Sequence, residues 1–131
     1  MTETLPITRF KNNSALKGRE DKFIALEVKV APILASWRES IFSHEWLTPD
    51  GKIKKPSDMV QKIKEKRQET DNIIDNQDLQ LERPVLGIGI LDNIEIGSGR
   101  DLFLCLAARG ADSIPVHIPK SHEGDFRIFI R

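Results

Sequence analysis

The chain has a single cysteine, no excess of either charge and no long apolar run. Because Cys105 has no second thiol to pair with, an internal disulfide and a metal site built from paired cysteines are both excluded. The 20 Lys and Arg residues balance the 20 Asp and Glu residues, so the chain as a whole has no net electrostatic attraction to nucleic acid or to an anionic membrane. No apolar stretch approaches the roughly 20 residues that span a bilayer, and the polar start does not resemble a signal peptide. We therefore expect a cytoplasmic protein with no membrane partner, whose ligands are recognised by local features.

The hydrophobic pattern over 131 residues predicts an α+β fold, with a mixed sheet and flanking helices. Residues 1–21 show no sustained apolar period, so we expect a flexible N-terminal arm followed by a single domain over residues 22–131. Alternating or continuous apolar residues predict strands at 23–30, 83–91, 94–97, 113–119 and 126–130. Apolar residues at helical spacing predict helices at 31–47, 57–74 and 101–109, the second with Ser57 as its N-cap.

A short turn lies where the strand at 94–97 passes into the helix at 101–109. It consists of Gly97, Ser98, Gly99 and Arg100. The start of a helix exposes unpaired N–H groups with a partial positive charge, and anions bind there. Glycine permits close backbone approach, a serine hydroxyl donates a hydrogen bond, and an arginine can bind two phosphate oxygens at once. These four residues are the candidate ligand-binding site.

An ordinary strand-to-helix turn is the alternative for the same four residues. Two glycines and a serine suit any such turn. In that case Arg100 pairs with a neighbouring carboxylate, either Glu95 or Asp101. The spacing fits neither the dinucleotide-binding fingerprint nor the phosphate-loop lysine motif, so the residues alone leave both readings open.

The stretch "IEIGSGRDLFLCLAARGADSIPVHI", residues 94–118, resembles the core of the ParB/sulfiredoxin-like superfamily. The shared order is a strand, a short glycine-containing turn that ends in Arg, an apolar helix with small residues, a glycine and an "IPV" strand. "RPVLGIGIL" takes the place of the strand that usually precedes this core, and together they form roughly the C-terminal third of the chain.

This resemblance implies a ParB/sulfiredoxin-like core that binds nucleotide phosphate at the turn and the helix start. Members of the superfamily include CTP-binding chromosome-partitioning proteins, sulfiredoxins that use ATP, and small plasmid-borne nucleases. The implied ligand is ATP or CTP with Mg²⁺, held by Gly97 and Arg100, and the implied activity is hydrolysis of a nucleotide or a nucleic acid. Ser98 stands where sulfiredoxins place their catalytic cysteine, so the reaction itself stays open.

The remaining candidate residues carry weaker signals. His44, His117 and His122 are scattered, and the alternation of its strand predicts that His117 points toward solvent or a neighbouring loop. The loop "PKSHEGDF" gathers charged side chains that could border a site, although exposed loops commonly have this composition. Cys105 between two leucines is predicted to be a small buried hydrophobe.

A basic segment supports a rival hypothesis, in which the chain is a non-enzymatic module that holds a protein or nucleic acid such as DNA. The segment consists of Lys52, Lys54, Lys55, Lys62, Lys64, Lys66 and Arg67. Clustered lysines contact nucleic-acid phosphates, but a solvated helix face has the same composition, and aromatic residues for base stacking are scarce there. Trp46 beside this segment is either an exposed partner contact or the anchor of a helix end.

Overall fold

The computed structural model describes residues 9–130. The α-helices in that range are α1 (Val30–Trp37), α2 (Gln61–Asp75) and α3 (Arg100–Ala108). The strands are β1 (Phe10–Lys11), β2 (Phe23–Lys29), β3 (Leu81–Glu82), β4 (Leu86–Ile88), β5 (Ile94–Ile96) and β6 (Ser113–Pro119). Short 3₁₀ turns join several of these elements. The fold is therefore of the α+β class, as the hydrophobic pattern predicts.

The strands form three two-stranded pairs rather than one continuous mixed sheet. β2 and β6 are antiparallel over their full length, β4 and β5 form an antiparallel hairpin, and β1 and β3 are parallel. A single parallel bridge between Val85 and His117 joins the first two pairs, with the His117 amide donating to the Pro84 carbonyl at 2.9 Å. Prolines at 84, 115 and 119 lack the N–H group that a longer ladder needs. The pairing between β6 and the segment before β4 is therefore limited to this one bridge.

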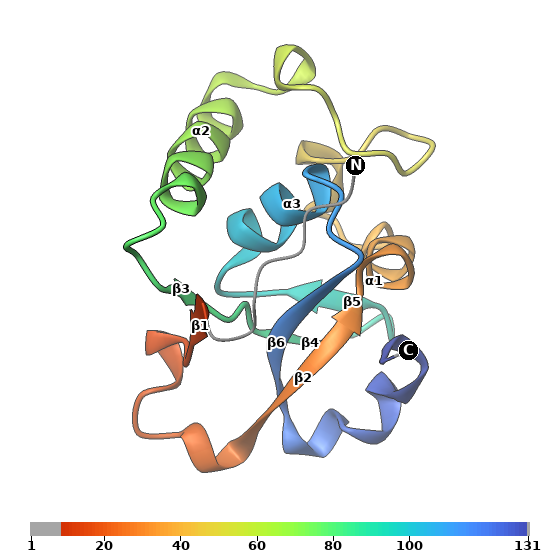
Figure 1. Ribbon diagram of the computed structural model, residues 1–131. Coiled ribbons are helices and arrows are strands. Elements are labelled where there is room, and N and C mark those ends of the chain that lie inside the picture. The colour runs from red at the N-terminus through yellow and green to blue at the C-terminus, as the bar shows by residue number, and fades with distance from the viewer. Residues whose placement is uncertain (1–8, 131) are drawn as a thin grey trace.

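Helix α3 lies at the centre of the molecule. Figure 1 shows it between α2 and the strands. Its four consecutive residues Phe103–Leu106 are all buried, which is typical of a helix that is covered on most of its faces. On the α2 side, Arg109 holds the two helices together through ion pairs with Asp71 and Asp75 at 3.1 and 2.9 Å.

The hairpin β4–β5 directs the chain toward the candidate turn. Its loop, residues 89–93, closes with a hydrogen bond from the Gly89 amide to the Asn93 carbonyl at 2.8 Å. Asp92 has φ of +61°, a left-handed conformation that Asp and Asn adopt more readily than most residues. The break between the predicted strands at 83–91 and 94–97 is confirmed as this turn. β5 then runs directly into residues 97–100.

Helix α1 is shorter than the pattern predicts. It ends at Trp37, although the predicted helix runs to residue 47, and Ile41 within that range is 74% exposed. The Ser43 hydroxyl donates toward the Arg38 and Ser40 carbonyls at 3.0 and 2.8 Å. Such side-chain bonds to the backbone compete with helix continuation. Helix α2 also differs, because it starts at Gln61 and Ser57 lies in a separate 3₁₀ turn instead of capping it.

The described part of the expected N-terminal arm belongs to the packed structure. Phe10 and Leu16 are buried, and Phe10 is in register with Leu81 in the β1–β3 pair. Residues 10–16 of the expected arm are therefore packed against the domain, residues 17–21 are exposed, and residues 1–8 lie outside the described range. Only two apolar side chains of this segment are buried, Phe10 and Leu16. Two positions are too few to give the repeating apolar pattern by which a helix or strand is recognised in a sequence.

The C-terminal segment is a 3₁₀ helix, Gly124–Phe129, where the sequence predicts a strand. Phe126 and Phe129 are buried three residues apart, while Ile128 is 79% exposed. A spacing of three residues matches the period of a 3₁₀ helix. The apolar residues at 126, 128 and 130 do not form one buried face, because Ile128 is exposed. Between residues 9 and 130, no helix is both long and apolar enough to cross a membrane.

Candidate functional site

The turn at residues 97–100 is clamped to the segment that leads into β4. The Gly97 amide donates to the Val85 carbonyl, and the Val85 amide donates to the Ser98 carbonyl, both at 2.8 Å. Gly99 has φ of +85°, and a Cβ atom there would lie 2.8 Å from the Cα of Pro84. Glycine is required at position 99 on two counts, because the backbone is left-handed and Pro84 leaves no room.

Four backbone N–H groups at this turn have no hydrogen-bond acceptor among residues 9–130. They belong to Ser98, Gly99, Asp101 and Leu102. The Arg100 amide, by contrast, donates to the Gly97 carbonyl at 3.2 Å. Unpaired donors at the first turn of a helix carry the positive end of its dipole. The arrangement expected from the sequence, with open donors at the start of α3, is therefore present.

A cavity of about 330 Å³ lies in front of these donors. Its wall combines the turn with the N-terminal segment, α2 and β3. The lining residues are Asn13, Thr70, Ile73, Gln80, Leu81, Glu82, Ser98, Gly99, Arg100, Asp101 and Leu102. This volume is at the lower end of the range for small-molecule sites, and it suits a compact ligand with hydrogen-bonding groups.

The Ser98 hydroxyl donates to the Oδ1 atom of Asn13 at 3.2 Å. Asn13 is buried, and its Nδ2 atom donates to the Arg83 carbonyl at 2.9 Å. Its Oδ1 atom also accepts from the Ala15 amide, as the N-cap of a 3₁₀ turn. Asn13 is not among the residues that the sequence pattern singles out. The available signal was its position directly before "SAL", which is typical of an N-cap.

Arg100 forms neither of the ion pairs that the ordinary-turn reading requires. Its Nε atom donates to the Ile96 carbonyl at 3.1 Å, and its guanidinium carbon lies 4.6 Å from the centre of the Phe42 ring. Glu95 is engaged elsewhere, because its carboxylate accepts from the Ser40 hydroxyl at 2.7 Å and from Asn93 at 3.1 Å. Arg100 is thus a half-buried cation held by a carbonyl and an aromatic ring, with no carboxylate pairing its charge among the described residues.

Two carboxylates, Glu82 and Asp101, line the same cavity. The Oε1 atom of Glu82 accepts from the amide and the hydroxyl of Ser14, both at 3.1 Å. The described residues contain no group of three or more His, Cys, Asp or Glu side chains placed to hold a metal ion. Between residues 9 and 130 the cavity therefore has two acidic side chains but no complete metal site.

The other sequence candidates lie away from this cavity. His117 is buried, so of the two predicted surroundings, solvent or a neighbouring loop, solvent is wrong; its Nδ1 atom has no hydrogen-bond partner. Burial, and then the nearby charge of Arg83, lower the pKa of His117 below its ordinary value. His122 packs over Gly87 of β4. Cys105 is buried in α3 as predicted, and burial raises its pKa to about 12, so its thiol is inert.

Trp46 is only 1% exposed, so the anchor interpretation is confirmed and the partner-contact interpretation is wrong. Arg67 of α2 lies over its ring at 5.9 Å and donates to the Lys54 carbonyl at 2.8 Å. Arg67 of the basic segment therefore has a structural role, because it links α2 to the loop that contains Lys54. Most of the lysines in the segment remain exposed.

Comparison of the chain with protein-family models, with curated proteins and with solved structures finds no match. The resemblance to the ParB/sulfiredoxin-like superfamily accordingly stays a prediction that rests on residues 94–118.

Proposed function

We propose that this chain binds a phosphate-bearing ligand, of the nucleotide class, in the cavity in front of α3. The observation that carries the proposal is the set of four unpaired N–H groups at Ser98, Gly99, Asp101 and Leu102 beside a cavity of about 330 Å³. Phosphate oxygens are strong acceptors, and they are the groups that such donors bind best. The ParB/sulfiredoxin-like resemblance supports the nucleotide class and suggests ATP or CTP.

Given the charges around the cavity, we expect the nucleotide to bind together with Mg²⁺. Glu82 and Asp101 would repel a bare triphosphate, and Arg100 is the one cationic side chain that lines the cavity. A divalent cation on the nucleotide would reduce this repulsion, because its charge lies between the phosphate and the carboxylates. Binding is therefore expected to depend strongly on Mg²⁺.

The proposal concerns binding rather than hydrolysis. The Ser98 hydroxyl of the turn donates to the amide oxygen of Asn13 instead of to a base. An activated hydroxyl nucleophile needs a general base within hydrogen-bond reach. The cavity supplies the donors for recognition but lacks that pair.

Isothermal titration calorimetry with ATP and CTP, each with Mg²⁺ and with EDTA, tests the proposal. Arg100→Ala is expected to weaken Mg²⁺–nucleotide binding by about tenfold, the effect of losing one charge-assisted interaction. Asp101→Asn is expected to shrink the gain in affinity that Mg²⁺ gives, because it removes one of the two carboxylates that the cation offsets. Asp112→Asn is the matched control, since it changes the net charge equally at an exposed residue outside the cavity.

Two results would contradict the proposal. One is the absence of heat with either nucleotide in the presence of Mg²⁺. The other is an equal response of Asp101→Asn and Asp112→Asn, because the effect would then follow the net charge of the protein and not the cavity.

A further inference from the structure

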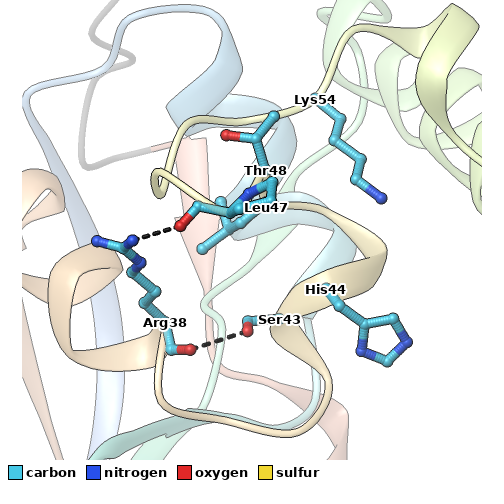
Figure 2. A pocket seen from close by; sticks show the side chains of 7 residues that line it. Arg38, Ser43, His44, Leu47, Thr48 and Lys54 are labelled. Atoms are coloured by element: carbon cyan, nitrogen blue, oxygen red, sulfur yellow. Dashed lines mark hydrogen bonds between the residues drawn. The ribbon is translucent and has the colours of Figure 1, made fainter.

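A second cavity, of about 360 Å³, lies between the end of α1, the 3₁₀ turn Ser43–Glu45 and the loop at residues 47–54. Figure 2 shows Arg38 on one side of it, and Lys54 and His44 on the other. It shares no lining residue with the cavity in front of α3. We call it the basic pocket; its lining residues are Arg38, Ser43, His44, Leu47, Thr48, Pro49 and Lys54.

The walls of the basic pocket are fixed by backbone contacts. Leu47 is bridged to Ile53 across the loop, the Thr48 amide donates to the Lys52 carbonyl at 2.8 Å, and the Lys54 amide donates to the Trp46 carbonyl at 2.8 Å. Trp46 and Leu47 are buried in the core. The loop is therefore anchored at its base, and the pocket is preformed, which keeps the ordering cost of binding low.

Arg38 is held in position before any ligand arrives. Its Nη2 atom donates to the Pro49 carbonyl. Its side chain also lies against Gly51, where a Cβ atom would come within 3.3 Å of the Arg38 Cδ atom. Nε and Nη1 are then left without a hydrogen-bond partner in the described part of the chain, and a guanidinium with two open donors on a fixed stem suits a phosphate group.

The charge lining the basic pocket is positive. The ammonium group of Lys54 has no hydrogen bond or ion pair with any residue in 9–130, although the side chain is partly buried. The Nδ1 atom of His44 lies 2.8 Å from the Ile41 carbonyl, so Nδ1 carries the proton and Nε2 stays open. The lining residues include no carboxylate. Asp50, in the same loop, accepts from the Thr48 hydroxyl, and its pKa is lowered first by that bond and further by Lys52 and Arg38.

We propose that the basic pocket binds a phosphate monoester, with Arg38 and Lys54 on the phosphate and the rest of the ligand along Leu47 and Pro49. The charges match, because a monoester carries about −1.5 to −2 at pH 7 and the two side chains supply two positive charges. A monoester needs no metal ion here, since no carboxylate lines the pocket. This site is separate from the proposed nucleotide cavity, and either site can exist without the other.

An NMR titration of the ¹⁵N-labelled protein with phenyl phosphate in EDTA tests this proposal. The amide signals of Thr48 and Lys54 and the Nε signal of Arg38 should shift and saturate with one dissociation constant. Lys54→Gln should weaken binding by about tenfold or more. Lys55→Gln is the matched control, because Lys55 is exposed and does not line the pocket, and it should change the dissociation constant less than about twofold.

Dimethyl phosphate distinguishes the monoester from a nucleic-acid backbone, because it is a diester with a single negative charge. It should bind the basic pocket several-fold more weakly than phenyl phosphate. Equal or tighter binding of the diester would overturn the monoester assignment in favour of nucleic acid. The site itself would be overturned by unsaturable shifts, or by equal weakening in Lys54→Gln and Lys55→Gln, because either result means diffuse attraction to surface charge.

Discussion

Replacing Gly99 with alanine should destabilise the fold through one contact, the approach of the turn to Pro84. The added Cβ atom would lie 2.8 Å from the Pro84 Cα, which is backbone and cannot rotate away. Overpacking of this kind costs about 1–3 kcal/mol. The left-handed backbone adds about 1–2 kcal/mol of strain, and the lower entropy of the unfolded chain offsets about 0.4–1 kcal/mol of the total.

Gly18→Ala is the matched control for this prediction. Gly18 has the same φ of +85°, but a Cβ atom there would meet nothing within 4 Å. Backbone strain and the entropy of the unfolded chain then change equally in both variants. The difference in stability between the two variants therefore measures the Pro84 contact alone. Urea unfolding followed by tryptophan fluorescence should place the midpoint of Gly99→Ala below that of Gly18→Ala by about 0.5–1.5 M. Coincident midpoints would refute the claim that Pro84 fixes this turn.

Three further predictions concern buried and charged groups. The thiol of Cys105, with a pKa raised to about 12, should react with Ellman's reagent at pH 8 about a thousandfold more slowly in the folded protein than in urea; comparable rates would show that it is accessible. The pKa of His117 is lowered by burial and by Arg83, so below pH about 6.5 the unfolded chain binds a proton that the folded protein excludes. Stability should therefore fall between pH 7.5 and 5.5, and an unchanged fall in His117→Leu would assign it to other groups. Removing the ion pairs of Arg109 with the Arg109→Met variant should lower the free energy of unfolding by about 1–3 kcal/mol, less at high salt, because the side chain joins α2 and α3 through the half-buried Asp71 and the exposed Asp75; a loss below about 0.5 kcal/mol in urea unfolding would contradict this.

The sequence predicts the elements that have a strong local period. α3, β2, β6 and the β4–β5 hairpin all lie where alternation, helical spacing or turn residues indicate them. In β2 and β5 the buried side chains alternate, and in α3 and β6 they form a continuous buried run, so in each case neighbours in the sequence carry the information. The position of the candidate turn was predictable for the same reason, because it lies between two such elements.

The rest of the fold depends on contacts that are distant in the sequence. Asn13 meets Ser98 across 85 positions, and Glu82 meets Ser14 across 68, so the wall of the candidate cavity has no local signature. The 3₁₀ helix at the C-terminus is a case of two patterns competing. Residues 126–130 allow both a spacing of two and a spacing of three, and only the burial of Phe129 decides for the second.

The roles of individual residues in the turn were also beyond the sequence. Glycine at position 99 suits a ligand-binding loop and a tight turn equally, and the approach of Pro84 accounts for it without any ligand. Arg100 has two carboxylates as sequence neighbours and pairs with neither, because Phe42 and the Ile96 carbonyl hold it. Which partner an arginine selects depends on the tertiary structure around it, and charge spacing along the chain does not determine it.

The central claim is that the unpaired donors at the start of α3 bind phosphate, and an NMR titration with Mg²⁺–ATP and Mg²⁺–CTP tests it most directly. Hydrogen bonding to phosphate moves amide proton signals downfield, and the four amides of Ser98, Gly99, Asp101 and Leu102 have no other acceptor among residues 9–130. These four signals should move downfield and saturate together with one of the two nucleotides. The amides of Gly97 and Arg100, which already donate to the Val85 and Gly97 carbonyls, should move much less. Shifts that leave the four amides unchanged with both nucleotides, or that centre elsewhere on the protein, would contradict the claim.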